Sequence, residues 1–139
     1  MLKAPLTNFD FMDYYKGNKL FGGVYSRDNI PHNLRNRFYI INMDDTEGQG
    51  THWVVVYNVG NLCIYFDSFG VDPPEEVLGR MRKTNKKMVM NTFRIQDLKS
   101  IKCGFFCMHV IDELLRGREY IDVLVYFNPT DYKANEHLV

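Results

Sequence analysis

Two runs of β-forming residues separated by a turn constrain most strongly how this chain can fold. The runs are Trp53 to Tyr57 (Trp-Val-Val-Val-Tyr) and Leu62 to Phe66 (Leu-Cys-Ile-Tyr-Phe). β-Branched and aromatic residues of this kind favour strands. The residues between them, Asn58-Val59-Gly60-Asn61, have the composition of a tight turn. The two runs are therefore predicted to form an antiparallel hairpin.

This hairpin brings a histidine close to an aspartate. In the register that places Tyr57 opposite Leu62, His52 lies opposite Asp67. Cross-strand partners on one face have Cβ atoms about 4.5–5.5 Å apart, within reach of an imidazole–carboxylate hydrogen bond. A slide of two residues would keep the pair as diagonal neighbours on one face, whereas a slide of one would separate them.

A second strong pattern is an amphipathic helix over residues 103–116. Its apolar positions are 103, 106, 107, 110, 111 and 114, which lie on one helical face, and Gly117 is placed to end it. Cys103 and Gly104 open this helix. A helix N-terminus and a nearby imidazolium favour a thiolate, which is the reactive form of cysteine.

The start of this helix also offers hydrogen-bond donors. The first N–H groups of a helix have no partner within it, and Gly104 leaves room for a substrate backbone to approach. Together with the side-chain amide of Gln96, these groups can form an oxyanion hole. Cys103, His52, Asp67 and Gln96 are then the nucleophile, base, orienting acid and oxyanion donor of a thiol hydrolase.

The rest of the chain mixes helical and strand signals without strict alternation, which indicates the α+β class. Expected helices run from Asn8 to Tyr15, capped by Asn8 or Asp10, and for roughly ten residues from Pro73-Pro74-Glu75-Glu76. Expected strands are Arg37 to Met43 and Met88 to Ile95, and Tyr120 to Phe127 is either strand or helix. Turn or loop is expected at Gly22-Gly23, at Asn29-Ile30-Pro31 and over Asp44 to Gly50.

Composition limits the possible function classes. The 139 residues are 45% hydrophobic and include ten Phe and nine Tyr, so residues 1–139 are predicted to form one domain. The net charge is zero, which predicts neither nucleic-acid nor membrane-surface binding. No apolar run reaches the about 18 residues of a membrane span. The exception in charge is a basic run, which is either a solvated helix end or an anion contact: Arg80, Arg82, Lys83, Lys86 and Lys87.

Three cysteines and no secretory signal indicate a reducing compartment rather than a disulfide scaffold. Cys107 lies on the core-facing stripe of the helix and Cys63 lies inside a strand, so both are expected to be buried small hydrophobes. No CxxC motif occurs. Neither a zinc site nor any other metal or cofactor is therefore predicted.

The order of these residues resembles that of the adenovirus-type maturation proteases (adenain), a family related to the ubiquitin-like-modifier proteases. The matching order is His52-Trp53, Asp67, Gln96 and Cys103-Gly104. Further similar stretches, which together span about Leu20 to Leu115, are Phe21 to Tyr25, Gly50 to Trp53, Phe66 to Gly70 and Cys103 to Cys107. The short length and the tail from Phe127 to Lys133 resemble the proteases of Maverick/Polinton elements and virophages more closely.

The resemblance implies a papain-like or adenain-like cysteine protease fold. In such a fold a central mixed or antiparallel sheet packs against a buried helix that starts at the nucleophile. The roles implied are nucleophile for Cys103, base for His52, orienter for Asp67 and oxyanion donor for Gln96. Trp53 and Gly104 are implied to line the substrate site.

The implied activity is endopeptidase processing of viral capsid or other virion precursors, often after small residues such as Gly-Gly. The implied location is the virion and the host-cell cytoplasm or viral factory. Two alternatives stay open: a processing or deconjugating protease for a ubiquitin-like modifier, and a virion-associated binding module without catalysis. The adenoviral enzyme uses a disulfide-linked peptide and DNA as activators. Here no cysteine lies between Asp67 and Gln96, and only the basic run 80–87 suits an activating peptide or nucleic acid.

Overall fold

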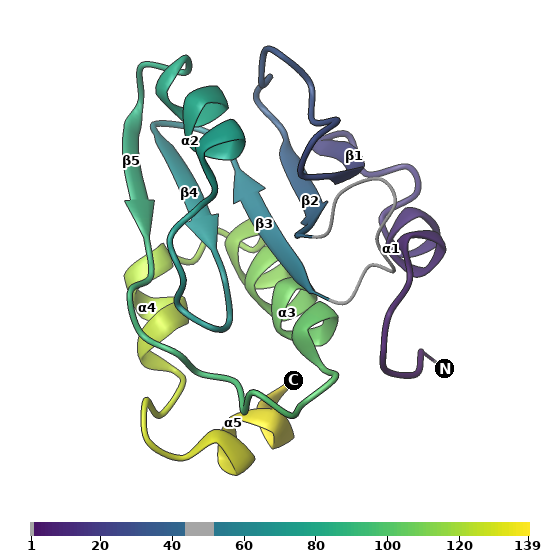
Figure 1. Cartoon of the computed structure of the whole chain (residues 1–139), viewed down its shortest axis with the longest axis vertical. Helices are drawn as coiled ribbons and strands as arrows, with labels where there is room; N and C mark the ends of the chain where they lie inside the picture. Colours follow the sequence, from purple (N-terminus) through teal and green to yellow (C-terminus); the bar gives the residue numbers. More distant parts are fainter. Residues whose placement is uncertain (1, 44–51) are drawn as a thin grey trace.

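A five-stranded mixed sheet forms the centre of the computed structural model, which describes residues 2–43 and 52–139 (Figure 1). The strands are β1 (Phe21–Ser26), β2 (Phe38–Asn42), β3 (Trp53–Tyr57), β4 (Leu62–Phe66) and β5 (Lys87–Met90), and they lie in sequence order. β2, β3 and β4 are antiparallel, and each edge strand is parallel to its neighbour. The helices are α1 (Asn8–Tyr14), α2 (Glu75–Arg82), α3 (Cys103–Leu115), α4 (Tyr120–Val125) and α5 (Tyr132–Leu138).

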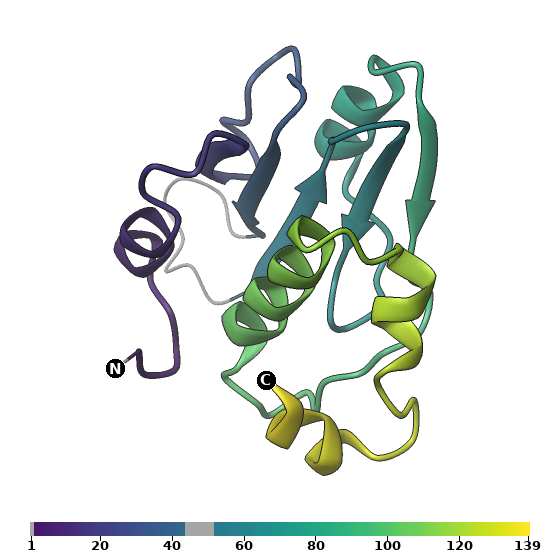
Figure 2. The same ribbon diagram turned by 180° about the vertical axis from the view of Figure 1, so that it is seen from behind.

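Helices cover both faces of the sheet, and each face has its own apolar core. α3 packs against β3 on one face, where Val55 and Phe66 belong to one apolar core with Phe106 and Ile111 of the helix. α2 covers the other face with Val77 and Met81. Figure 2 shows α3 and α4 in front of the sheet when it is viewed from behind. The long apolar runs of β2, β3 and β4 follow from this arrangement, because strands covered on both faces need no polar side.

The hairpin of β3 and β4 is confirmed with the predicted bounds, but its register differs by two residues. Tyr57 pairs with Ile64 rather than with Leu62. The turn is wider because Asn58 still belongs to the β2 side of the sheet. Its N–H donates to the Arg37 carbonyl at 3.0 Å and its side-chain amide donates to the Arg35 carbonyl at 2.8 Å. A slide of two residues keeps every side chain on its predicted face.

The N-terminal part differs from prediction in two places. Thr7, not Asn8 or Asp10, caps α1, and Asp10 completes a capping box with it. The glycine pair Gly22-Gly23, expected in a turn, lies inside β1, at an irregularity in its pairing with β2. Glycines inside a strand commonly mark such a bulge. The loop predicted over Asp44 to Gly50 lies outside the described residues.

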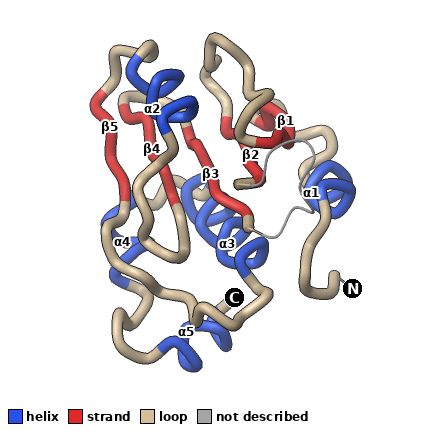
Figure 3. Tube along the Cα trace, in the orientation of Figure 1, coloured by secondary structure: helices blue, strands red, loops and turns tan. Residues whose placement is uncertain are grey.

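The C-terminal part contains more helix and less strand than predicted. The predicted strand from Met88 ends early, since β5 stops at Met90, and residues 91–102 form a long segment without helix or strand (Figure 3). Tyr120 to Val125 is helical, which resolves the open alternative. The last helix, α5, was not predicted. It packs beneath the 91–102 segment, where its Asn135 side chain donates to the Ile95 carbonyl at 2.9 Å.

Candidate active site

His52 and Asp67 form a buried pair at the end of the sheet where β3 begins and β4 ends. Nε2 of His52 donates to Oδ1 of Asp67 at 2.7 Å, and the side chains are 15% and 3% exposed. Because a carboxylate only accepts hydrogen bonds, the Nε2 proton is held toward Asp67. The same Oδ1 accepts the Phe69 N–H at 2.8 Å. The predicted imidazole–carboxylate contact is therefore present, reached from the diagonal rather than the directly opposite position.

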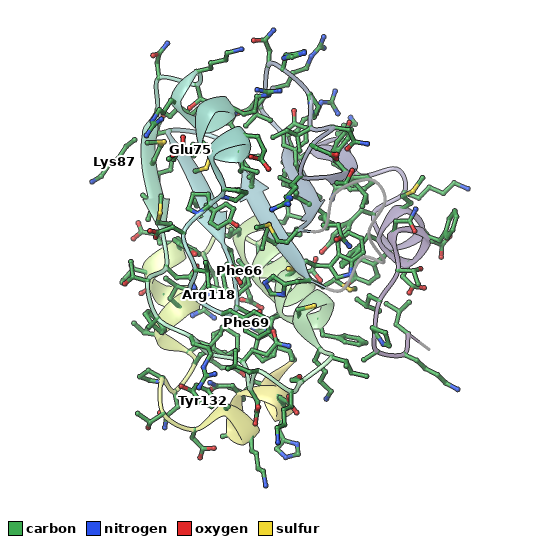
Figure 4. The ribbon with its side chains drawn as sticks, viewed as in Figure 1. Phe66, Phe69, Glu75, Lys87, Arg118 and Tyr132 are labelled. Atoms are coloured by element: carbon green, nitrogen blue, oxygen red, sulfur yellow. The ribbon has the colours of Figure 1, made fainter. Side chains whose placement is uncertain are left out.

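The other ring nitrogen of His52 is left for the thiol. Nδ1 is buried and has no hydrogen bond of normal geometry among the described residues. The ring interacts instead with Cys103, and it stacks on Phe69 with centroids 4.3 Å apart and planes 11° apart. Figure 4 labels Phe69 beyond the ends of the strands, below Phe66. This stacking fixes the plane of the imidazole between the carboxylate and the thiol.

The surroundings of His52 favour its charged form. Burial lowers the pKa of the imidazole, but the hydrogen bonds to Asp67 and Cys103 and the charges of both groups outweigh burial and raise the pKa to about 9. An imidazolium beside a thiol stabilises the thiolate, which is the nucleophilic form. The His52 imidazole beside Cys103 is therefore protonated at neutral pH.

Cys103 is the first residue of α3 and is 4% exposed. The helix N-terminus contributes a partial positive charge at this end. Cys107 lies one turn further on and is fully buried, with its Sγ 3.3 Å from the Trp53 carbonyl oxygen. Burial raises the pKa of both Cys107 and Cys63, which keeps them as thiols. The expectation that these two cysteines are core residues is confirmed.

Gln96 is fully buried, and both ends of its side-chain amide are hydrogen-bonded. Its Oε1 accepts the Ser68 hydroxyl, next to Asp67, and its Nε2 donates to the Ser100 carbonyl at 3.1 Å, three residues before Cys103. One Nε2 proton is enough for that bond, so the second can serve another acceptor. The part of Gln96 as an oxyanion donor stays a prediction.

Asp67 is held by residues to which the sequence had given no role. Asn91 Nδ2 donates to the Asp67 carbonyl at 2.6 Å, and its Oδ1 accepts the Asp67 N–H at 3.1 Å. The Tyr120 hydroxyl, from α4, donates to the same Oδ1 at 3.2 Å. The sequence does offer one indication of this role, because Asn91 is a polar residue directly after the apolar run of β5. The strand predicted from Met88 to Ile95 included Asn91, so no separate role was assigned to it.

The N-terminal segment occupies the space beside Trp53 and Gly104. Trp53 is 5% exposed, packs edge-to-face on Phe11, and donates from Nε1 to the Leu6 carbonyl at 2.9 Å. A Cβ at Gly104 would lie 2.9 Å from Cβ and Cδ1 of Leu6. The room expected at Gly104 for a substrate is thus filled by Leu6 on that side. Both residues have a packing role, and their contact with substrate stays a prediction.

This packing predicts that Gly104→Ala is destabilising. Alanine favours helices over glycine by about 0.5–1 kcal/mol, but a Cβ 2.9 Å from Leu6 forces the segment outward. Overpacking of this kind costs about 1–3 kcal/mol, so we expect a net loss of unfolding free energy in urea titrations. Leu6→Ala in the same chain should recover part of the loss, because it removes one of the clashing atoms.

Gly79→Ala is the matched control for that measurement. Gly79 lies within α2, and nothing is within 4 Å of a Cβ built there. This variant should gain about 0.5–1 kcal/mol. Equal gains for the alanines at 79 and 104, with no coupling between positions 6 and 104, would contradict the close packing of the N-terminal segment on the head of α3.

The basic run lies at the other end of the sheet from the site. Lys87, at the start of β5, is labelled far from Phe69 in Figure 4. Three side chains of the basic run donate hydrogen bonds to main-chain carbonyls of the protein itself: Arg80 to Pro31, Lys83 to His32 and Lys86 to Asn58. Residues 2–43 and 52–139 contain no cluster of three metal-ligating side chains. No helix within the same ranges has the length and apolarity needed to cross a bilayer.

Comparison with known proteins supports the fold. No family model and no curated protein matches the chain. Two crystal structures of the ASFV pS273R protease do. One matches with a TM-score of 0.63 and 18% identity over 96% of this chain and 66% of its own. Its selenomethionine form matches with a TM-score of 0.52 and 23% identity over 73% of this chain and 43% of its own.

These matches show a shared fold, and the predicted α+β, papain-like protease fold is confirmed. The chain spans less than two thirds of the length of the neighbours it matches.

Proposed function

We propose that the protein is a viral cysteine endopeptidase. The observation that carries this proposal is His52, which hydrogen-bonds the buried carboxylate of Asp67 at 2.7 Å while the Cys103 thiol at the head of α3 interacts with the same imidazole. A nucleophile, a base within hydrogen-bond reach, and a group that orients the base define a thiol hydrolase. The fold shared with the ASFV pS273R protease supports the same assignment.

In the proposed mechanism the Cys103 thiolate attacks the carbonyl carbon of a peptide bond. The tetrahedral oxyanion accepts hydrogen bonds from the first-turn N–H groups of α3 and from Nε2 of Gln96. The intermediate collapses as the imidazolium of His52 gives its proton to the leaving amine, and a thioester remains on Cys103. His52 then removes a proton from a water molecule, whose oxygen attacks the thioester and releases the acid and the thiolate.

The proposed substrates are capsid or other virion precursor polypeptides cut after small residues such as Gly-Gly. The small residues are proposed from the resemblance to the adenovirus-type proteases. In the structure Cys103 is 4% exposed and the His52 side chain 15% exposed. Action in the virion and in the host-cell cytoplasm or viral factory is part of the proposal. An activating peptide or nucleic acid at the basic run stays a prediction.

A cleavage profile tests this function. The purified protein is incubated with a peptide library, with virion precursors and with ubiquitin-like modifiers extended beyond a Gly-Gly end, and new N-termini are identified by mass spectrometry. Cys103→Ala protein is the matched control. We expect internal cleavage after small residues in the library and in precursors. Cleavage of the modifier fusions alone would make the protein a modifier protease, and wild-type profiles equal to the control would end the proposal.

A further inference from the structure

Asp67 and Ser68 are consecutive buried residues whose side chains serve different parts of the site. Ser68 is fully buried, directly after the Asp67 that binds His52. Both residues lie in a turn that follows β4, closed by the Gly70 N–H donating to the Asp67 carbonyl at 2.8 Å. In this turn the Asp67 side chain binds the imidazole, and the Ser68 hydroxyl binds Gln96. The chain leaving β4 thus contacts both the proposed base and the proposed oxyanion donor.

The orientation of the Gln96 amide follows from its two partners. The Ser100 carbonyl can only accept a hydrogen bond, so the NH₂ end of the amide must face it, at 3.1 Å. The carbonyl end Oε1 then faces Ser68, whose hydroxyl must donate. A fully buried amide without the second contact would leave Oε1 unsatisfied, which costs about 1–3 kcal/mol. Ser68 is therefore the group that stabilises this orientation against a flipped or rotated amide.

Ser68 also holds the main chain that carries Gln96. Its carbonyl accepts the N–H of Ile95 at 2.9 Å and the N–H of Gln96 at 3.3 Å. Asn135 of α5 binds the Ile95 carbonyl from the other side. The segment 91–102 has no helix or strand of its own, as the loop trace in Figure 3 shows, so these contacts replace a regular ladder.

We propose that Ser68 is a positioning residue, which locks the Gln96 amide with its NH₂ group directed for oxyanion binding. This inference rests on the proposed thiol-protease function and deepens it. Asp67 and Ser68 together then couple the alignment of the base to the alignment of the oxyanion donor. Ser68 itself does not touch the substrate and acts only through Gln96.

Ser68→Ala separates this role from a general loss of structure. Removing one oxyanion donor costs on the order of 10²-fold or more in kcat, which is the loss expected for Gln96→Ala. We expect Ser68→Ala to lower kcat by a factor between about ten and the 10²-fold loss expected for Gln96→Ala. KM should change little. The double variant should be no slower than Gln96→Ala alone, because residues acting as one unit are not additive. Alkylation of Cys103 by iodoacetamide forms no oxyanion, so its rate should be unchanged.

Ser26→Ala is the matched control, because the Ser26 hydroxyl, at the end of β1, donates to the exposed Asp28 at 3.0 Å. It should leave all these rates unchanged. Wild-type kcat in Ser68→Ala, or losses that add in the double variant, would overturn the role of Ser68. An equal fall in hydrolysis and alkylation would also overturn it, by indicating a structural role. A wild-type protein without peptidase activity would instead end the proposed function.

A measurement on the wild-type protein covers the case in which Ser68→Ala does not fold. A buried serine hydroxyl that donates to an amide oxygen exchanges its proton slowly with water. We expect one such hydroxyl signal in proton NMR spectra of the wild type, coupled through space to Ile95 and lost in Gln96→Ala. A signal that persists in Gln96→Ala, or no protected serine hydroxyl at all, would overturn the proposal.

Discussion

Replacing Cys103 by alanine is expected to abolish peptide hydrolysis and to leave the fold intact. The sulfur is the proposed attacking atom, and removal of a nucleophile from a catalytic unit costs on the order of 10⁴-fold or more in kcat. The lost side-chain volume is one sulfur atom at the first residue of α3. Single changes of this size usually cost less than about 3 kcal/mol, so we expect a folded protein with a native circular dichroism spectrum.

Cys107→Ala is the matched control, since this thiol is fully buried one turn further along the same helix. Its Sγ contacts the Trp53 carbonyl, so the variant should lose stability and keep its kcat. The opposite pattern, in which Cys107→Ala is inactive while Cys103→Ala hydrolyses substrate normally, would exclude Cys103 as the nucleophile. Unfolding of Cys103→Ala would show that the residue has mainly a packing role.

Replacing His52 by alanine is expected to lower kcat/KM on the order of 10⁴-fold or more, because base and nucleophile act as one unit. In the wild type, kcat/KM should fall as pH rises through about 9, where the His52 imidazolium loses its proton. Asp67→Asn removes a group that raises this pKa, so the alkaline fall should move to lower pH. Stopped-flow hydrolysis of a fluorogenic peptide between pH 5 and pH 10 measures both effects.

The same group gives stability a defined pH dependence. The pKa of His52 in the fold, about 9, lies above the ordinary value of 6.5. Its protonation therefore stabilises the fold fully below about pH 6.5, and this contribution is lost as pH rises toward about 9. His52→Ala should lack it, whereas His32→Ala, at an exposed loop position, should keep it. If Asp67→Asn loses stability over the same alkaline pH range as the wild type, the loss does not arise from the deprotonation of His52.

The central hairpin and the nucleophile helix could be predicted from sequence because both have strong periodic signals. β3 and β4 have the predicted bounds, and α3 begins at the predicted cysteine. The register was wrong by two residues, since it depended on Asn58, whose bonds to the β2 side no local pattern reveals. The predicted contact of His52 with Asp67 is still present, because a register shift of two residues between β3 and β4 keeps each side chain on the same face.

The short elements were less predictable. β5 ends at Met90 because Asn91 turns its amide to Asp67 instead of continuing the ladder. α5 has seven residues, too few for a periodic signal. Its clearest local mark is Asp131, whose side chain accepts the Ala134 N–H at its start.

The polar residues that support the site were not predictable for a different reason. Ser68, Asn91 and Asn135 are buried, but serine and asparagine are ordinarily exposed, and nothing local distinguishes these three. Their roles arise from contacts between segments far apart in the sequence, such as Asn135 with Ile95. The sequence therefore indicates the reacting groups through their types and order, whereas only the fold reveals what holds them.

Cysteine labelling tests most directly whether Cys103 and His52 form an activated pair. The folded protein is treated with iodoacetamide between pH 6 and pH 9, and each thiol is quantified by peptide mapping. Cys103 should react first at every pH, and its fast reaction should disappear in His52→Ala, while the buried thiols of Cys63 and Cys107 react slowly in both proteins. Equal, slow labelling of all three thiols, unchanged by His52→Ala, would contradict the proposed active site.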